Sequence, residues 1–151
     1  MPWTLYSKRQ RTLFLYQRAK SFLGAAVLLQ RQGGDEFVVL HLFCQGIEIF
    51  LKTILLMKDF DRFNPQLQRN YGHNLERLTE AALQEYRLHQ VRPPLMSELH
   101  QLNELYSHQW LRYGSLFHDL FIDPRAINTQ WLHWRTIAAL RIVERELRRN
   151  P

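Results

Sequence analysis

The sequence has few residues that interrupt or cross-link a fold: one cysteine, six glycines and six prolines in 151 residues. A single cysteine forms no disulfide within the chain, and the position of Cys44 in an apolar run predicts a buried thiol in a reducing compartment. So few glycines and prolines are not typical of a turn-rich all-β protein. Most of them separate apolar segments of helical periodicity, which favours a helical fold.

A long uncharged apolar run is also missing. The most apolar segment, Phe37–Met57, is interrupted by Glu48 and Lys52, so we expect no membrane span. The first residues lack the basic stretch, apolar stretch and cleavage site of a secretory signal. These absences predict a soluble, cytoplasmic protein with no membrane partner.

Patterns that hold metals or nucleotide cofactors do not occur either. The sequence contains no His-x(3)-His and no paired cysteines, which metal sites commonly use. It has no Gly-x-Gly-x-x-Gly and no Walker loop, and Gly33-Gly34 is expected to stop a helix instead. We therefore expect no metal and no cofactor.

Acidic residues are the minority charge, 14 against 20 Lys and Arg, which gives a formal charge of +6. Much of the basic excess lies near the two ends of the chain. Such a balance is compatible with RNA, DNA or an acidic protein partner. Cations near a helix C-terminus also have a purely structural role, because they interact favourably with the helix dipole.

The apolar residues that are present, 46% of the chain, recur mostly at helical spacing. We predict one domain over residues 1–151 with an all-α fold, an up-and-down bundle of four to five helices. The predicted helices cover 7–32 and Phe37–Met57, and others start at Asn74, near Pro94 and at Asp123-Pro124. The segment 59–72 is predicted to be a loop.

Periodicity also predicts which helix faces are buried. The expected inward stripe of the first helix consists of Leu13, Tyr16, Leu23, Ala26 and Val27. The expected stripe of the last helix consists of Ile127, Trp131, Trp134, Ala138 and Ile142. Phe37–Met57 is apolar on nearly every side and is predicted to be central, with Gly46 at a close helix contact and a Glu48–Lys52 pair at i, i+4.

The stretch Leu99–His118 carries the residues with chemical potential. It is predicted to be a helix that ends at Arg112-Tyr113-Gly114, with His118 after the break. His108 stands four residues before Arg112, so the two are expected on one helix face.

Four pieces of the sequence occur in an order that resembles the HEPN family, helical domains associated with minimal nucleotidyltransferases. They are Ile47–Leu56, like an "E-x-x-L-K" helix; Gly72–Leu78, like a "G-H-D-L" helix start; Leu105–Gly114, like an "R-Y" helix end; and a final helix. The resemblance covers about residues 15 to 145.

The resemblance implies a bundle of four or five helices, usually a homodimer, and in many members a metal-independent endoribonuclease. The family's Arg-x(4–6)-His pair corresponds to Arg112 and His118, with His108, Tyr113, Glu48 and Lys52 as supporting residues. It implies toxin or defence roles, with an antitoxin or a nucleotidyltransferase as partner. Two positions depart from nuclease members: Tyr113 replaces a small polar residue, and Leu120 stands where toxins often have tyrosine.

The chemistry fits RNA cleavage, because a histidine moves protons near neutral pH and an arginine holds a phosphate with two hydrogen bonds. The same residues are equally compatible with a solvated arginine and a packed histidine. Two other functions therefore stay open: a non-catalytic module that binds a nucleotidyltransferase or another protein, and a dimeric interaction protein. The aromatic residues Tyr106, Trp110, Trp131 and Trp134 are expected in the core, in a dimer face or in a base-stacking platform.

Overall fold

The computed structural model describes residues 2–113, 123–127 and 129–149. Every regular element in these residues is a helix or a helical turn, and no strand occurs among them. The elements are α1 (Leu5–Arg31), α2 (Glu36–Lys58), α3 (Phe60–Phe63), η1 (Leu67–Tyr71), α4 (Leu75–Glu85), α5 (Pro93–Ser107), α6 (Trp110–Tyr113), η2 (Pro124–Ala126) and α8 (Gln130–Arg149). The all-α prediction is confirmed for this part of the chain.

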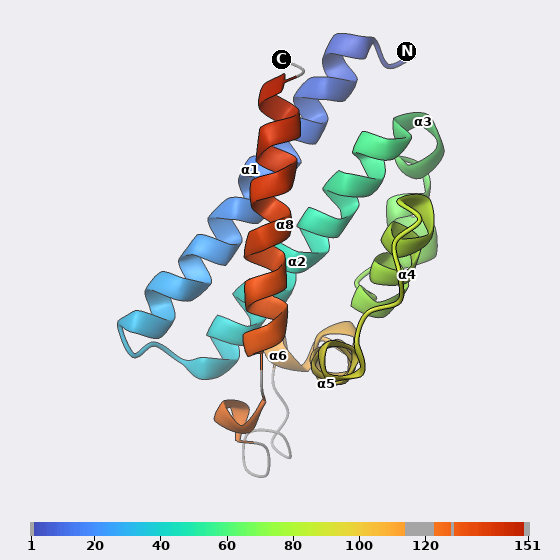
Figure 1. The fold of residues 1–151 in the computed structure, drawn as a ribbon. Helices are drawn as coiled ribbons and strands as arrows, with labels where there is room; N and C mark the ends of the chain where they lie inside the picture. The colour runs from blue at the N-terminus through green and yellow to red at the C-terminus, as the bar shows by residue number, and fades with distance from the viewer. Residues whose placement is uncertain (1, 114–122, 128, 150–151) are drawn as a thin grey trace.

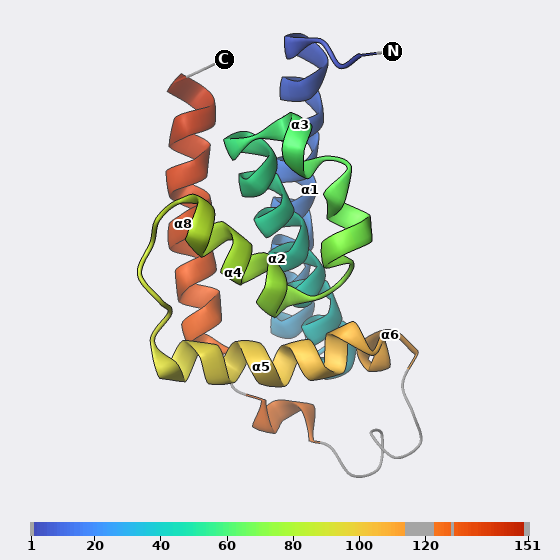
Figure 2. The same cartoon turned by 90° about the vertical axis from the view of Figure 1, so that its right-hand side faces the viewer.

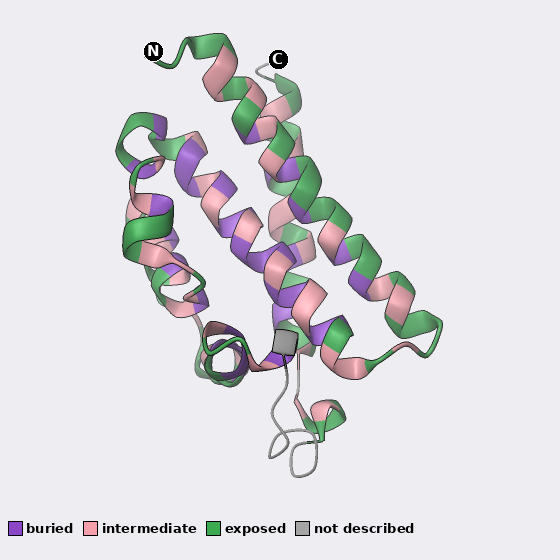
Figure 3. Ribbon diagram, turned by 180° about the vertical axis from the view of Figure 1, so that it is seen from behind, coloured by how far each residue is buried: buried purple, intermediate pink, exposed green. Residues whose placement is uncertain are grey.

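Helix α2 is the centre of the molecule, as its apolarity predicts. Its buried side chains come from nearly every turn between Val39 and Leu56, and Cys44 and Leu55 have no exposed surface. Figure 3 shows buried residues along the length of α2, while the outer side of α1 is exposed. By length and composition α2 is also apolar enough to cross a membrane, and 56% of its most apolar window is buried by the other helices.

The long helices α1, α2 and α8 run side by side, with both chain ends near the same end of the bundle (Figure 1). Helix α5 departs from an up-and-down arrangement, because it crosses the far end of these helices (Figure 2). The simple up-and-down bundle is therefore only partly right. Helix α5 packs on α4, α6, α8 and α2, so it closes one end of the core.

The ends of α1 and the start of α2 follow the sequence signals. The side chain of Thr4 caps α1, and Gly33, with φ of 70°, takes the left-handed conformation that ends the helix. The carboxylate of Asp35 accepts a hydrogen bond of 3.0 Å from the Val38 amide, which starts α2. Of the predicted α1 stripe, Tyr16, Leu23 and Ala26 are buried.

The segment 59–72 contains more structure than the predicted loop. Asp59 caps the short helix α3, and residues Leu67–Tyr71 form one turn of π-helix before Gly72. The reason is burial: Phe60, Phe63 and Leu67 enter the main core and hold the chain in helical turns. Local turn residues such as Asn64-Pro65 carry no sign of this long-range packing.

The predicted helix over Leu99–His118 breaks earlier than expected. Helix α5 ends at Ser107, and Gln109 has φ of 61°, a left-handed conformation that interrupts the helix before α6 begins. His108 and Arg112 therefore do not stand at i, i+4 on one continuous helix, and that prediction is wrong. The expected break at Gly114 lies outside the described residues.

The buried face predicted for the last helix is also wrong. Asp123-Pro124 opens the short turn η2, and α8 starts only at Gln130. Trp131, Trp134 and Ile142 are 54%, 64% and 54% exposed, whereas the buried residues of α8 are Leu132, Thr136 and Val143. Four of the five predicted positions, Trp131, Trp134, Ala138 and Ile142, thus lie on the outward face of α8, whereas Ile127 precedes the helix and packs against the main core.

Candidate functional site

A network of polar side chains centres on Glu48 in the middle of α2. One oxygen of this carboxylate accepts a hydrogen bond of 2.5 Å from Lys52 Nζ. The other oxygen is 2.9 Å from His73 Nδ1 and accepts a hydrogen bond of 2.5 Å from the Tyr106 hydroxyl. Lys52 Nζ also donates to the Gly72 carbonyl at 2.9 Å. We call these four side chains, Glu48, Lys52, His73 and Tyr106, the Glu48 network.

The Glu48 network keeps its central carboxylate ionised. Burial pushes the pKa of Glu48 upward, but hydrogen bonds from Lys52, Tyr106 and His73 outweigh burial and hold the pKa below its ordinary value. Both carboxylate oxygens are engaged by donors. Glu48 is therefore an anchor for its neighbours, and it is not placed as a base toward solvent.

Local structure explains how the four side chains meet. Glu48 and Lys52 share one face of α2 at i, i+4. His73 lies in the turn before α4, which starts where the Asn74 side chain accepts a hydrogen bond of 2.9 Å from the Arg77 amide. The side chain of Asn103 from α5 also accepts a hydrogen bond of 2.8 Å from the Leu75 amide. Helix α5 thus fixes the start of α4 and delivers Tyr106 to the same place.

His73 is the member of the network that reaches solvent. Its side chain is 54% exposed, compared with 8% for Glu48 and 14% for Lys52. The Glu48 carboxylate orients the imidazole through Nδ1, which is how a carboxylate positions a histidine for proton transfer or binding at its other nitrogen. This position therefore has more chemical capacity than helix capping or packing alone would give it.

Sequence reasoning did not place two residues at this site: Tyr106 of the network and the nearby His41. The ring centroid of Tyr106 is 5.9 Å from that of His41 and also 5.9 Å from that of His73. Tyr106 was expected in the core, in a dimer face or in a base-stacking platform, and His41 lies inside the apolar segment that forms α2. Only the helical register of α2 and α5, which brings the rings together, could have indicated their proximity.

The predicted catalytic pair is only partly described by the structure. Arg112 lies in α6, a short helix packed on α2 and α5, with Leu111 buried beside it. The side chains of Arg112 and Tyr113 and the whole of His118 lie outside the described residues. No distance between Arg112 and His118 follows from the structure, so the pair stays a prediction.

His108, predicted as a supporting residue, is exposed and engaged locally. Its Nδ1 is 2.8 Å from the Glu104 carbonyl, and its ring stacks on Trp110 with 4.9 Å between centroids. It stabilises the corner between α5 and α6. The Cys44 thiol offers no nucleophile, because burial and the nearby Glu48 charge raise its pKa.

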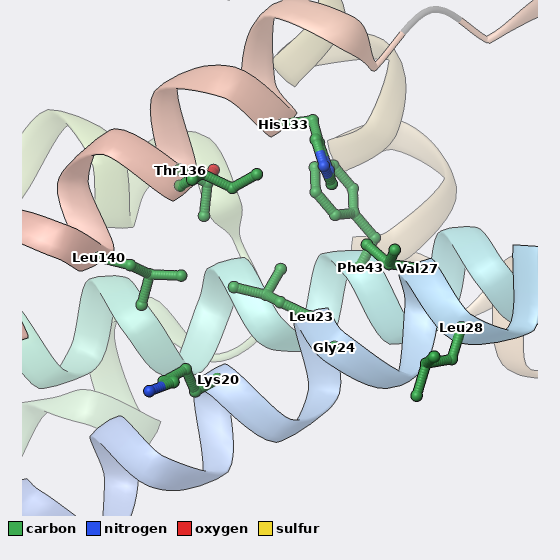
Figure 4. A pocket seen from close by; sticks show the side chains of 10 residues that line it. Lys20, Leu23, Gly24, Val27, Leu28, Phe43, His133, Thr136 and Leu140 are labelled. Atoms are coloured by element: carbon green, nitrogen blue, oxygen red, sulfur yellow. The ribbon is translucent and has the colours of Figure 1, made fainter. Parts of the chain in front are cut away.

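A separate apolar pocket of about 370 Å³ lies between α1 and α8, above α2 (Figure 4). Its lining includes Leu23 from α1 and Phe43 from α2, and the ring centroid of His133 lies 5.7 Å from that of Phe43. Lys20 lies at one end of the pocket, and its Nζ donates a hydrogen bond of 3.3 Å to Glu144 Oε1. No residue of the Glu48 network lines this pocket. Among the described residues, no group of three or more His, Cys, Asp or Glu could hold a metal ion.

Comparison with known proteins adds no relative. No family model matches the chain, and neither a curated protein nor a solved structure matches it. What can be said of its function therefore depends on its own residues.

Proposed function

We propose that this chain is an HEPN-like, metal-independent endoribonuclease of the toxin or defence type that acts as a homodimer. The observation that supports it most is the Glu48 network. The pieces resembling the "E-x-x-L-K" and "G-H-D-L" motifs, 25 residues apart at Glu48 and His73, meet through a hydrogen bond. The helix that carries Arg112 packs on the same central helix.

The proposed reaction is transfer of a phosphodiester to the neighbouring 2′-hydroxyl of RNA. His118 of one protomer takes the 2′-hydroxyl proton while the oxygen attacks phosphorus, and the 5′-oxygen leaves. His118 of the second protomer, in its protonated form, gives that leaving oxygen a proton. Arg112 stabilises the charge of the phosphorane. The products are a 2′,3′-cyclic phosphate and a 5′-hydroxyl, and the step needs no metal.

The decisive experiment is cleavage of a generic single-stranded RNA in EDTA. We expect Arg112→Ala and His118→Ala each to lose at least about a hundredfold in rate, equivalent to about 2.7 kcal/mol of transition-state stabilisation. Arg31→Ala and His89→Ala are matched controls, because both residues are exposed and lie outside the network. They should cleave like the parent.

A second function, a non-catalytic module that binds a nucleotidyltransferase, an antitoxin or another protein, is favoured by one observation. The apolar pocket between α1 and α8 is open to a side chain of a partner. A folded parent dimer that leaves RNA intact, or two variants that cleave at the parental rate, would make this module the better proposal.

A further inference from the structure

The outward face of α8 combines exposed tryptophans with arginines. Trp131 and Trp134 are 54% and 64% exposed, and Ile142 on the same side is 54% exposed. Arg135, Arg141 and Arg145 are exposed on the same helix. At 100° per residue these six residues fall on the side of α8 opposite its buried residues. We call these six residues the α8 outer face.

Within the described part of the chain, the arginines of the α8 outer face have no partner that the fold requires. Among the described residues, no hydrogen bond, ion pair or ring contact involves the side chains of Arg135, Arg141 or Arg145. The acids that α8 does carry are already engaged. Glu144 pairs with Lys20 and Arg148, and Glu146 pairs with Arg149. The face therefore presents cationic charge that is not neutralised.

Large aromatic side chains on a solvent-facing helix side need a second explanation, since neither Trp131 nor Trp134 belongs to a core cluster of the described residues. The main core contains Leu132 from α8, and the second cluster contains Val143. Helix α8 lies on the side of α2 that faces the viewer in Figure 1. Its outer face is thus free of the other described helices, and indole rings and guanidinium groups are the groups that stack on nucleobases and hold phosphates.

We infer that the α8 outer face binds single-stranded RNA, with bases stacked on Trp131 and Trp134 and phosphates held by Arg141 and Arg145. The inference deepens the proposed function, on which it rests, by locating where the RNA strand lies. From Trp131 to Arg145 the helix rises about 21 Å, which suits a short run of nucleotides along its axis. The net charge of +6 adds a long-range attraction for the same ligand.

Charge decides between RNA and the other occupants. A second copy packed on this face by two-fold symmetry would bring the same arginines together with no acid of its own to neutralise them. A protein partner of ordinary interface size covers about 800 Å² on each side, mostly with an apolar centre. Here the apolar side chains are interleaved with arginines along one helix, which matches alternating bases and phosphates better.

The test uses a fluorescein-labelled oligo(A) strand with a non-cleavable 2′-O-methyl backbone and the full chain. We compare Trp134→Ala/Arg141→Gln with Trp3→Ala/Arg11→Gln, a control that removes the same residue types elsewhere. Trp3 is 44% exposed, and its ring centroid lies 5.5 Å from Arg11 Cζ. Both residues are far from α8 along the chain. The α8 variant should bind at least about fivefold more weakly, and the control should bind like the parent.

Two further readouts locate the contact. Removing Arg141 should flatten the plot of log affinity against log salt by about 0.7, the value for one phosphate of a single strand. Tryptophan fluorescence should be quenched by oligo(A) in the parent, and the quenching should fall in Trp131→Ala/Trp134→Ala. Undiminished binding by the α8 variant, or an equal loss in the control, would overturn the inference.

Other outcomes identify the alternative occupants. Poly-L-glutamate that displaces oligo(A) equally well at equal charge would indicate an acidic protein surface and overturn the RNA inference. Conversion of a dimer to a monomer by Trp131→Ala/Trp134→Ala, with RNA affinity unchanged, would make the face an interface between copies. The inference and the proposed function can fail separately. If RNA binds through α8 but is not cleaved, the result counts only against catalysis. If the α8 variant cleaves RNA at the parental rate, the result counts only against RNA binding by this face.

Discussion

Glu48 is the residue that holds the Glu48 network together, because Lys52, His73 and Tyr106 all bond to its carboxylate. Lys52 is 14% exposed beside it, and within the described residues Glu48 is its only carboxylate partner. Glu48→Gln should therefore lower the free energy of unfolding by about 3 kcal/mol, because it leaves a buried ammonium without its counter-charge. Urea unfolding at pH 7 measures the change.

Glu144→Gln provides the control for that measurement. Glu144 also pairs with two cations, Lys20 and Arg148, but these pairs are at the surface. We expect no measurable change in stability. An equal loss in both variants would mean that burial of Glu48 is not what makes its ion pair important.

The lowered pKa of Glu48 predicts the acid limb of stability. The ordinary value is 4.5, and the folded value lies below it. As the pH falls, the Glu48 carboxylate takes up a proton in the unfolded chain before it does so in the folded protein. The contribution of Glu48 to the free energy of unfolding is therefore complete above about pH 4.5 and is lost as the pH falls through the lowered folded pKa. The stability difference between the parent and Glu48→Gln should shrink over that window in urea titrations at successive pH values. A constant difference would contradict the assignment.

At the scale of elements, two glycines on neighbouring helices have opposite roles. A Cβ at Gly46 would lie 2.5 Å from Leu23 Cγ, whereas a Cβ at Gly24 would have no heavy atom within 4 Å. Gly46→Ala should destabilise the protein by about 1–3 kcal/mol through overpacking between α1 and α2. Gly24→Ala should stabilise it by about 0.5–1 kcal/mol through helix propensity. Thermal or urea unfolding of both variants reveals the sign.

The start of α8 depends on a side chain from α5. Both oxygens of Glu98, which is buried, accept hydrogen bonds from α8, at 3.4 Å from the Trp131 amide and 3.0 Å from the Leu132 amide. Glu98→Ala should cost about 1–2 kcal/mol and speed amide exchange in the first turn of α8. Glu104→Ala, at an exposed position of the same helix, should leave both unchanged. Equal protection of Leu132 in the two variants would exclude the capping role.

Contacts between segments far apart in the sequence are the reason that the face of α8 could not be predicted. The stripe of Trp131, Trp134 and Ile142 has perfect helical spacing, and hydrophobicity alone places it inward. Glu98 lies 33 residues before Trp131 and binds amides of the first turn, and the side chains that α8 buries are Leu132, Thr136 and Val143. Local signals, by contrast, were sufficient for the helix stop at Gly33-Gly34 and the helix start at Asn74.

The candidate site, like the face of α8, could be predicted only in part from the sequence. The Glu48–Lys52 pair follows from spacing within one helix, and the sequence identified it. Its other partners do not, because His73 and Tyr106 are 25 and 58 residues away from Glu48 along the chain. Arg112 and His118 were identified through the family resemblance, and their geometry lies outside the described residues.

The whole molecule leaves large apolar side chains at its surface. Besides α8, helix α1 exposes Tyr6, Phe14 and Leu28, each by more than 60%. Exposed apolar area of this kind commonly marks an interface, so we expect a homodimer at micromolar concentration. Sedimentation velocity tests this, and a monomer at that concentration would contradict the dimer and the shared active site proposed with it.

Cys44 gives the molecule a built-in reporter of core opening. It is the only cysteine, it lies in the central helix, and its exposed fraction is zero. A thiol reagent can reach it only when the helices around α2 separate, so the labelling rate with excess reagent measures how often the bundle opens. Each substitution discussed above can then be ranked in native buffer, without denaturant, by a single absorbance trace.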